Sequence, residues 1–167
     1  MSGTETCPGC GERFPPSDGP VHAYLGASAG CWARYGELLA LEFGSPALMR
    51  WHRLTVDAYT AQHPGIAERR TAQSAHVHLV GLCLVLERGV DPSTVPPILR
   101  RMADGRRHDW LEPPELATPI GLTEVIAAAG SDRYGETVRS WAEAVWRAWT
   151  PHHATIRAEA EAALTSH

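Results

Sequence analysis

The sequence predicts a single all-α domain of five or six helices, arranged like a bundle, with a zinc-knuckle arm at its amino terminus. Apolar residues recur every three or four positions along most of the chain, and β-branched residues never alternate with polar ones over more than four positions. A length of 167 residues fits one domain, and 44% hydrophobic against 20% charged residues excludes wholesale disorder. We expect residues 1–30 to form the arm and a loop, and residues 31–167 to form the helical core.

The best-defined helix is the segment 51–65. Pro64 cannot continue a helix and disfavours the α region for the residue before it, so this helix ends at His63. A second helix is predicted over residues 31–43, and Pro46 is expected in the first turn of the helix that ends at His63, so only a few residues around 44–46 join the two. Such a short connection predicts an antiparallel helical hairpin.

Four further helical stretches follow the hairpin. Periodicity and helix-capping residues predict them over residues 66–87, 91–104, 122–129 and 134–164, the last of them bent at Thr150 and Pro151. His152 and His153 are expected to line this bend and face solvent. Residues 105–119 contain three prolines and no helical period, so we expect an extended connection there.

The net charge and the length of the apolar stretches argue against two kinds of partner, nucleic acid and a membrane. Fifteen basic and nineteen acidic residues give a formal net charge of -4 and a pI near 6.1, the wrong sign for a domain that neutralises phosphates, so we expect no nucleic-acid partner. The longest apolar stretch, residues 77–86, is too short to span a bilayer, and no signal-peptide pattern opens the chain. We expect a soluble, cytoplasmic protein with no membrane partner, and the sequence leaves its oligomeric state open.

Cysteine spacing gives the strongest chemical signal. Cys7 and Cys10 form a CxxC turn, which can place two thiolates about 2.3 Å from one zinc ion. Cys31 is the expected third ligand, because it begins a helix whose positive end favours a thiolate. Cys83 lies in an apolar run and is expected to be a small buried core residue. The alternative is that the CPGCG segment is a glycine turn with free thiols.

The fourth ligand follows from the geometry of the predicted hairpin. If the hairpin is centred near residue 45, Cys31 faces the last turn of the second helix, which ends at His63. His52 would face residue 38, roughly 10 Å further along the helix axis and out of reach of the same ion. His22 stays a rival, because it lies in a loop that can bend. A closed site with three cysteines and one histidine would be structural.

Polar side chains on the hairpin's second helix and on the next helix are the candidates for any acid-base chemistry. The best of them are His52, Asp57, Tyr59 and His78. The helical period directs His78 to the core and His76 away from it. A buried, unpaired carboxylate is too costly, so we expect Asp57 to be at least partly buried and hydrogen-bonded to an imidazole, either His52 or His78. No standard catalytic motif is present.

Four segments in this order carry a resemblance: CPGCG, GASAGCWARYGELLA, HRLTVDAYTAQHPG and HLVGLCLVLERG. They resemble the bacterial family catalogued as domain of unknown function 5946, over roughly the first ninety residues. The resemblance supports the ligand set and the polar row on the hairpin's second helix, but it implies no reaction. His22 lies outside the matching segments, which lowers it as a ligand.

Two functions of different class fit these observations. The first is a zinc-binding helical protein whose structural zinc pins the amino-terminal arm and which binds a small molecule or a partner protein. The alternative is a small metal-containing enzyme of a bacterial biosynthetic pathway, using His52, Asp57 and Tyr59 for acid-base chemistry in an interhelical pocket. The two differ in whether these side chains line a common pocket.

Overall fold

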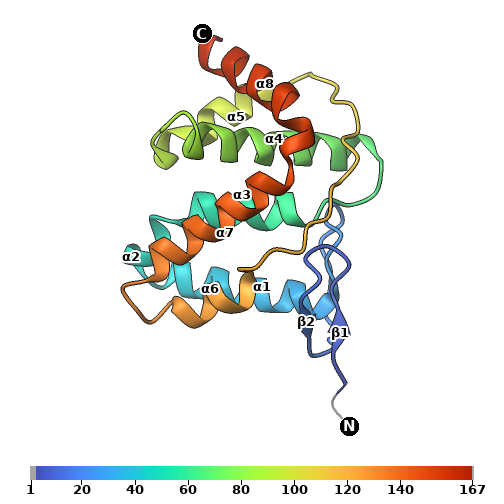
Figure 1. The fold of residues 1–167 in the computed structure, drawn as a ribbon, viewed down its shortest axis with the longest axis vertical. Coiled ribbons are helices and arrows are strands. Elements are labelled where there is room, and N and C mark those ends of the chain that lie inside the picture. The colour runs from blue at the N-terminus through green and yellow to red at the C-terminus, as the bar shows by residue number, and fades with distance from the viewer. Residues whose placement is uncertain (1–2, 167) are drawn as a thin grey trace.

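The computed structural model describes residues 3–166, and this part of the chain is mostly helical (Figure 1). The all-α prediction is confirmed. The helices are α1 (Ala29–Phe43), α2 (Pro46–Met49), α3 (His52–Gln62), α4 (Arg69–Leu86), α5 (Val95–Ala103), α6 (Leu122–Ala128), α7 (Tyr134–Ala148) and α8 (His153–Thr165). Short 3₁₀ helices cover Pro92–Thr94 and Thr150–His152, and β1 (Glu5–Thr6) pairs antiparallel with β2 (Arg13–Phe14).

The structure has two more helices than the six stretches expected, and one small sheet that was not expected. The predicted stretch 134–164 is divided by the 3₁₀ turn at Pro151 into α7 and α8. The hairpin connection contains α2, which Pro46 begins. The strands β1 and β2 have two residues each, too few to leave an alternating pattern in the sequence.

Helix α3 is the central element of the fold. It packs against α4 and α7, while α8 packs against α4 and α5, and α6 packs against α7 (Figure 1). Eight of the eleven residues of α3 are buried, including its threonines, Asp57 and Gln62. The buried polar groups on this helix therefore need hydrogen-bond partners inside the protein.

Helices α1 and α3 form the predicted antiparallel hairpin. The Tyr35 and Tyr59 rings stack with centroids 3.8 Å apart and planes at 5°. His52, which was predicted to face residue 38, instead meets Glu42 further along α1. The turn of the hairpin lies later in the chain than predicted, because α2 lengthens the connection.

The carboxyl-terminal half of the chain closes around the end of α3. Trp149 donates a hydrogen bond from its indole nitrogen to the carbonyl of Ala61 at 3.0 Å, and Trp141 donates one to the Gln62 side chain at 2.9 Å. The Gln62 amide in turn donates to the carbonyl of Leu116 at 2.8 Å, which fixes the extended connection between α5 and α6. Buried tryptophans thus anchor the helix that carries the site described below.

One prediction for this half of the chain is wrong. His153 was expected to face solvent at the bend, but its side chain is buried and stacks on Trp146 with ring centroids 3.9 Å apart. Its Nε2 atom donates to the carbonyl of Trp146, because α8 begins at His153 and folds back on the end of α7. Within residues 3–166, no helix combines the length and apolar character needed to cross a membrane.

Candidate metal centre

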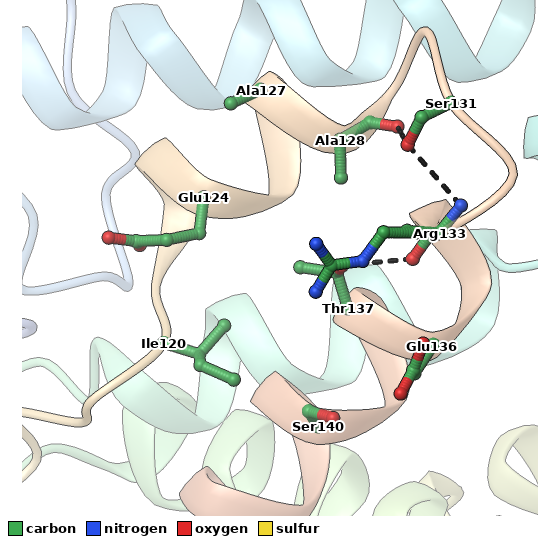
Figure 2. A pocket seen from close by; sticks show the side chains of 9 residues that line it. All are labelled: Ile120, Glu124, Ala127, Ala128, Ser131, Arg133, Glu136, Thr137 and Ser140. Atoms are coloured by element: carbon green, nitrogen blue, oxygen red, sulfur yellow. Dashed lines mark hydrogen bonds between the residues drawn. The ribbon is translucent and has the colours of Figure 1, made fainter.

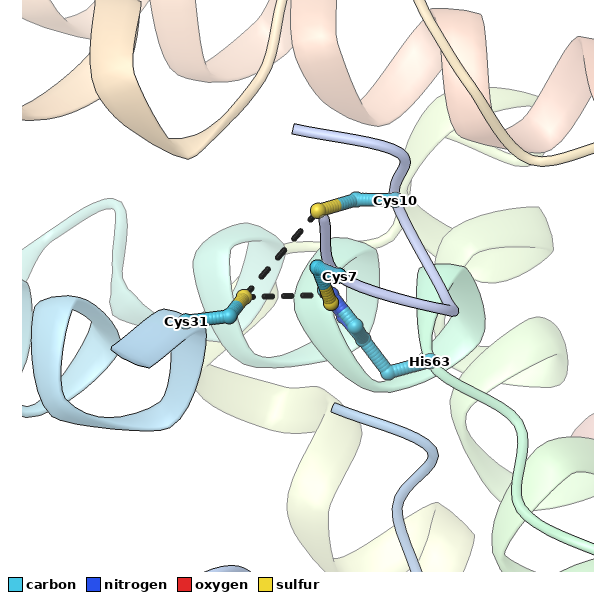
Figure 3. Close-up of side chains that lie close together, drawn as sticks. All are labelled: Cys7, Cys10, Cys31 and His63. Carbon is cyan, nitrogen blue, oxygen red and sulfur yellow. Dashed lines mark hydrogen bonds between the residues drawn. The ribbon is translucent and has the colours of Figure 1, made fainter. Parts of the chain in front are cut away.

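Three cysteines and one histidine converge at the end of α3. Cys7 and Cys10 come from the turn between β1 and β2, Cys31 from the first turn of α1, and His63 from the residue after α3 (Figure 3). One ligand atom from each lies within 4.8 Å of all the others. All four residues are at most 3% exposed. The structure therefore brings together the four side chains that the sequence analysis grouped, in a buried site able to hold a metal ion.

The distances in this group fit a tetrahedral ion. The Cys10 and Cys31 sulfur atoms are 4.0 Å apart, and the Cys31 sulfur is 3.4 Å from Nε2 of His63. Sulfur at about 2.3 Å and nitrogen at about 2.0 Å from one tetrahedral ion would be separated by roughly 3.8 Å and 3.5 Å respectively. Both observed separations lie within a few tenths of an ångström of these values.

Neighbouring groups prepare the ligands for an ion. Nδ1 of His63 is 2.7 Å from the carbonyl of Tyr59, and because a carbonyl can only accept, Nδ1 carries the proton and Nε2 keeps its lone pair. The Tyr59 hydroxyl lies 3.4 Å from the Cys31 sulfur, and the Ser28 amide donates to the Cys7 sulfur at 3.5 Å. The side chain of Ser28 also caps α1 by accepting from the Cys31 amide at 3.2 Å.

Glycines make the tight turn of the cysteine pair possible. The Cys7 amide donates to the carbonyl of Glu12, and the Gly11 amide donates back to the carbonyl of Cys7. Gly11 has a φ of 76°, a left-handed conformation that favours glycine. A Cβ on Gly9 would lie only 2.5 Å from the His63 ring. The turn can thus approach the end of α3 closely enough for its sulfurs to join the histidine.

The three thiols cannot all ionise without a cation. Hydrogen bonds from Cys10 and Cys31 lower the pKa of Cys7. The hydrogen bonds that Cys31 makes with Cys10 and Cys7, together with burial, raise the pKa of Cys31. A bound divalent ion would remove this competition, because its charge attracts all three thiolates at once.

The two alternative histidines lie outside this group. His22 is exposed, and its Nδ1 accepts a hydrogen bond from the Tyr24 amide at 3.2 Å. His52 lies at the opposite end of α3, where Nδ1 donates to Glu42 at 2.6 Å. His63 therefore completes the cluster.

Asp57 has the buried, paired environment that the sequence analysis predicted. Its side chain is fully buried and accepts hydrogen bonds from both Arg53, one turn earlier on α3, and Nδ1 of His78 at 2.7 Å. His78 is thus its imidazole partner, and His52 is not. The carboxylate rests on Gly81 of α4, where a Cβ would lie 2.3 Å from Oδ2 of Asp57.

The sequence analysis missed Glu42, which is fully buried at the other end of the hairpin. It accepts hydrogen bonds from Thr55 at 2.6 Å and from the Tyr134 hydroxyl at 2.7 Å, besides the one from His52. The signal was present: Glu42 continues the row of α1 residues, spaced by three and four, that includes the buried Tyr35 and Leu38. A carboxylate in an apolar row indicates an internal polar network.

The candidates for acid-base chemistry do not converge on one space. Tyr59 is fully buried beside the cysteines, His52 pairs with Glu42 at the far end of α3, and Asp57 and His78 pair between α3 and α4. His76, expected to point away from the core, is only 2% exposed, because α8 covers the side of α4 opposite α3. The named side chains thus belong to separate internal contacts.

The fold and the cluster define a helical protein with a buried group of three cysteines and one histidine. Residues 5–150 match the model described as "Family of unknown function (DUF5946)", and the chain belongs to this family. The matched region contains all four members of the cluster and the whole α1/α3 hairpin. No curated protein and no solved structure matches the chain.

Proposed function

We propose that this protein is a helical binding module stabilised by a structural zinc ion at Cys7, Cys10, Cys31 and His63. The observation that carries the proposal is the convergence of four buried ligand atoms within 4.8 Å, three of them sulfur. A set of three thiolates and one imidazole in tetrahedral spacing is typical of structural zinc sites. Zinc would join the β1/β2 turn to the start of α1 and the end of α3.

Two features favour a structural role over a catalytic one. Four protein ligands fill a tetrahedral shell, so no position is left for water or substrate. The side chains that could act in acid-base catalysis, His52, Asp57 and Tyr59, are engaged in separate internal hydrogen bonds. The ion would then act on folding: the arm buries few side chains of its own, and metal binding would supply the free energy that holds it.

A surface hollow between α6 and α7 gives room for the small molecule or the partner's side chain that this module would bind. It encloses about 550 Å³, within the usual range for ligand sites. Figure 2 shows Ile120 and Ala128 on its walls and the Arg133 side chain reaching into its middle. Because Glu124 and Glu136 line the hollow as well as Arg133, its charge does not favour an acidic ligand, and its apolar wall would contact the apolar part of a ligand.

Metal analysis tests the proposal directly. Protein purified without added metal should contain zinc that survives dialysis, and substituting Co²⁺ should give the thiolate-to-metal absorption of a cysteine site. Cys10→Ala and His63→Ala should each lose this tightly held zinc. Cys83→Ala is the matched control, since Cys83 is buried outside the cluster. Full zinc retention in Cys10→Ala would contradict the proposed ligand set.

A further inference from the structure

A second group of possible metal ligands lies on the other side of the core. His76 of α4, His108 of the connection 104–121 and Glu159 of α8 each direct one nitrogen or oxygen atom to a common point, all within 4.8 Å of one another. Nδ1 of His76 lies 2.9 and 2.8 Å from the two oxygens of Glu159, and the two imidazole rings pack with centroids 4.6 Å apart. Three elements distant in sequence thus build one site.

The hydrogen bonds of His76 require a cation in this site. Its Nε2 is 2.8 Å from the carbonyl of Asp109, which can only accept, so Nε2 carries a proton. A neutral His76 then presents the lone pair of Nδ1 to the carboxylate of Glu159, and two acceptors at 2.8 Å repel each other. Either a second proton or a metal ion must lie between them. The bond to Asp109 is also the outer contact that orients a metal-bound imidazole.

His108 distinguishes between these two cations. Its side chain is only 3% exposed, and within residues 3–166 its Nε2 atom is buried without a hydrogen-bond partner. Its Nδ1 lies 3.6 Å from Oε1 of Glu159. That distance is too long for a good hydrogen bond, and it is near the roughly 3.3 Å that separates two ligands each about 2.0 Å from one tetrahedral ion. The contact between His76 and Glu159 at 2.8 Å is shorter than this, so the carboxylate would move by about half an ångström to share an ion with both imidazoles. Nδ1 of His108 would therefore hold the ion and its Nε2 would keep a proton, whereas an ion pair between His76 and Glu159 alone gives this second buried imidazole no role.

We propose that His76, His108 and Glu159 form a second metal site, for a divalent transition ion such as Zn²⁺. Two imidazoles and one carboxylate are a common ligand set for such ions, and three protein ligands leave at least one position open to water. This is the main difference from the cysteine site, whose four ligands close the shell. His108 also lines a surface cavity together with Arg69, Arg107 and Trp110, so one member of the group lies beside a space open to solvent.

The experiment titrates Co²⁺ into full-length protein whose cysteine site already holds zinc, followed by calorimetry and absorption. We expect one further equivalent to bind without thiolate-to-metal absorption, because the second site has only nitrogen and oxygen ligands. Glu159→Gln and His108→Ala each remove a direct ligand and should weaken this uptake by at least the roughly hundredfold upper limit seen for loss of an outer-shell partner. Glu161→Gln, two residues away and exposed, is the matched control and should bind as the unchanged protein does.

Two results would overturn the proposal. One is a protein that takes up no second equivalent, with NMR showing both His76 ring nitrogens protonated; the group would then be an ion pair. The other is equal uptake by the unchanged protein and by Glu159→Gln. Neither result bears on the cysteine site, because thiolate absorption reports that site separately.

Discussion

Two buried polar centres, one within α3 and one beyond its end, balance their charge in different ways. The Asp57 carboxylate receives its positive partner from its own helix, through the two hydrogen bonds of Arg53, and is completed by His78. Within residues 3–166, the cysteine centre has no such partner among the groups that contact the sulfurs of Cys7 and Cys31. Those groups are the Ser28 amide, the Tyr59 hydroxyl and other members of the cluster. The first centre is neutralised by the chain, whereas the second would take its positive charge from the proposed zinc ion. Only the second should therefore couple folding to metal.

Removing the metal should give the largest effect. Structural zinc sites carry binding free energies on the order of 10 kcal/mol, and here that energy would hold residues 3–28 against the hairpin. We expect a strong chelator to abolish hydrogen-exchange protection in β1, β2 and their turn. Helices α3, α4 and α7 pack against one another and contain none of Cys7, Cys10 and Cys31, so those helices should stay protected. Equal protection of the arm with and without metal would show that the arm folds unaided.

Asp57→Asn should break the other centre without touching the metal. The substitution keeps the shape of the side chain but leaves the Arg53 guanidinium, only 18% exposed, without its counter-charge. Breaking a buried pair in this way costs about 3 kcal/mol. Urea denaturation should reveal that loss, whereas the zinc content should stay unchanged. Asp132→Asn, at an exposed position, is the control. Zinc loss in Asp57→Asn would mean that the two centres are coupled.

Gly81→Ala tests how closely α4 approaches the Asp57 carboxylate. The new Cβ would meet Oδ2 of Asp57 at 2.3 Å, so the carboxylate must move off Arg53 and His78. We expect a loss of about 1–3 kcal/mol in the free energy of unfolding, typical of an overfilled core. Gly36→Ala in α1 is the matched control, because its Cβ meets nothing within 4 Å and alanine favours a helix. Equal effects of the two substitutions would argue against this close contact.

The cysteine cluster could be predicted because its information is local. A CxxC turn, a cysteine at the start of a helix and a histidine before a proline each mark a position, and the hairpin brings those positions together. The hairpin was predicted to turn near residue 45, which is too early in the chain. The ligand prediction was still correct, because Cys31 was predicted to face the whole last helical turn before His63 rather than a single residue. His52 was predicted to face one residue, position 38, and that prediction failed. Because α2 lengthens the connection, His52 faces Glu42 instead.

The group of His76, His108 and Glu159 could not be predicted in the same way. Its members come from α4, an irregular connection and α8, and only tertiary packing brings them together. Periodicity also predicted that His76 points away from the core, because it assumed that α4 has a single buried face. Packing of α8 against α4 creates a second buried face, which contains His76. The nearly continuous apolar character of α4 was the available sign that both faces are covered.

The smallest expected effect comes from an ion pair that water reaches. Glu87 accepts two hydrogen bonds from Arg157, at 2.8 and 2.7 Å, and one from the Trp146 indole at 2.9 Å. The Arg157 bonds are the main cause that lowers the pKa of Glu87 to about 2. A depressed pKa means that the contact stabilises the fold above the ordinary value for glutamate, near 4.3, and that this contribution is lost as the pH falls toward 2.

Glu87→Gln should therefore be slightly less stable than the unchanged protein at pH 7, and the difference should shrink on acidification. Arg157 is 47% exposed, so solvent screens the pair and the difference should be well below that of Asp57→Asn. Urea denaturation at a series of pH values, followed by tryptophan fluorescence, measures it. Any acid-induced loss of metal affects both proteins alike and cancels in the difference. A gap that widens as the pH falls from 5 to 3 would mean that Glu87 is stabilised in its protonated form, which would reverse the sign argued from Arg157.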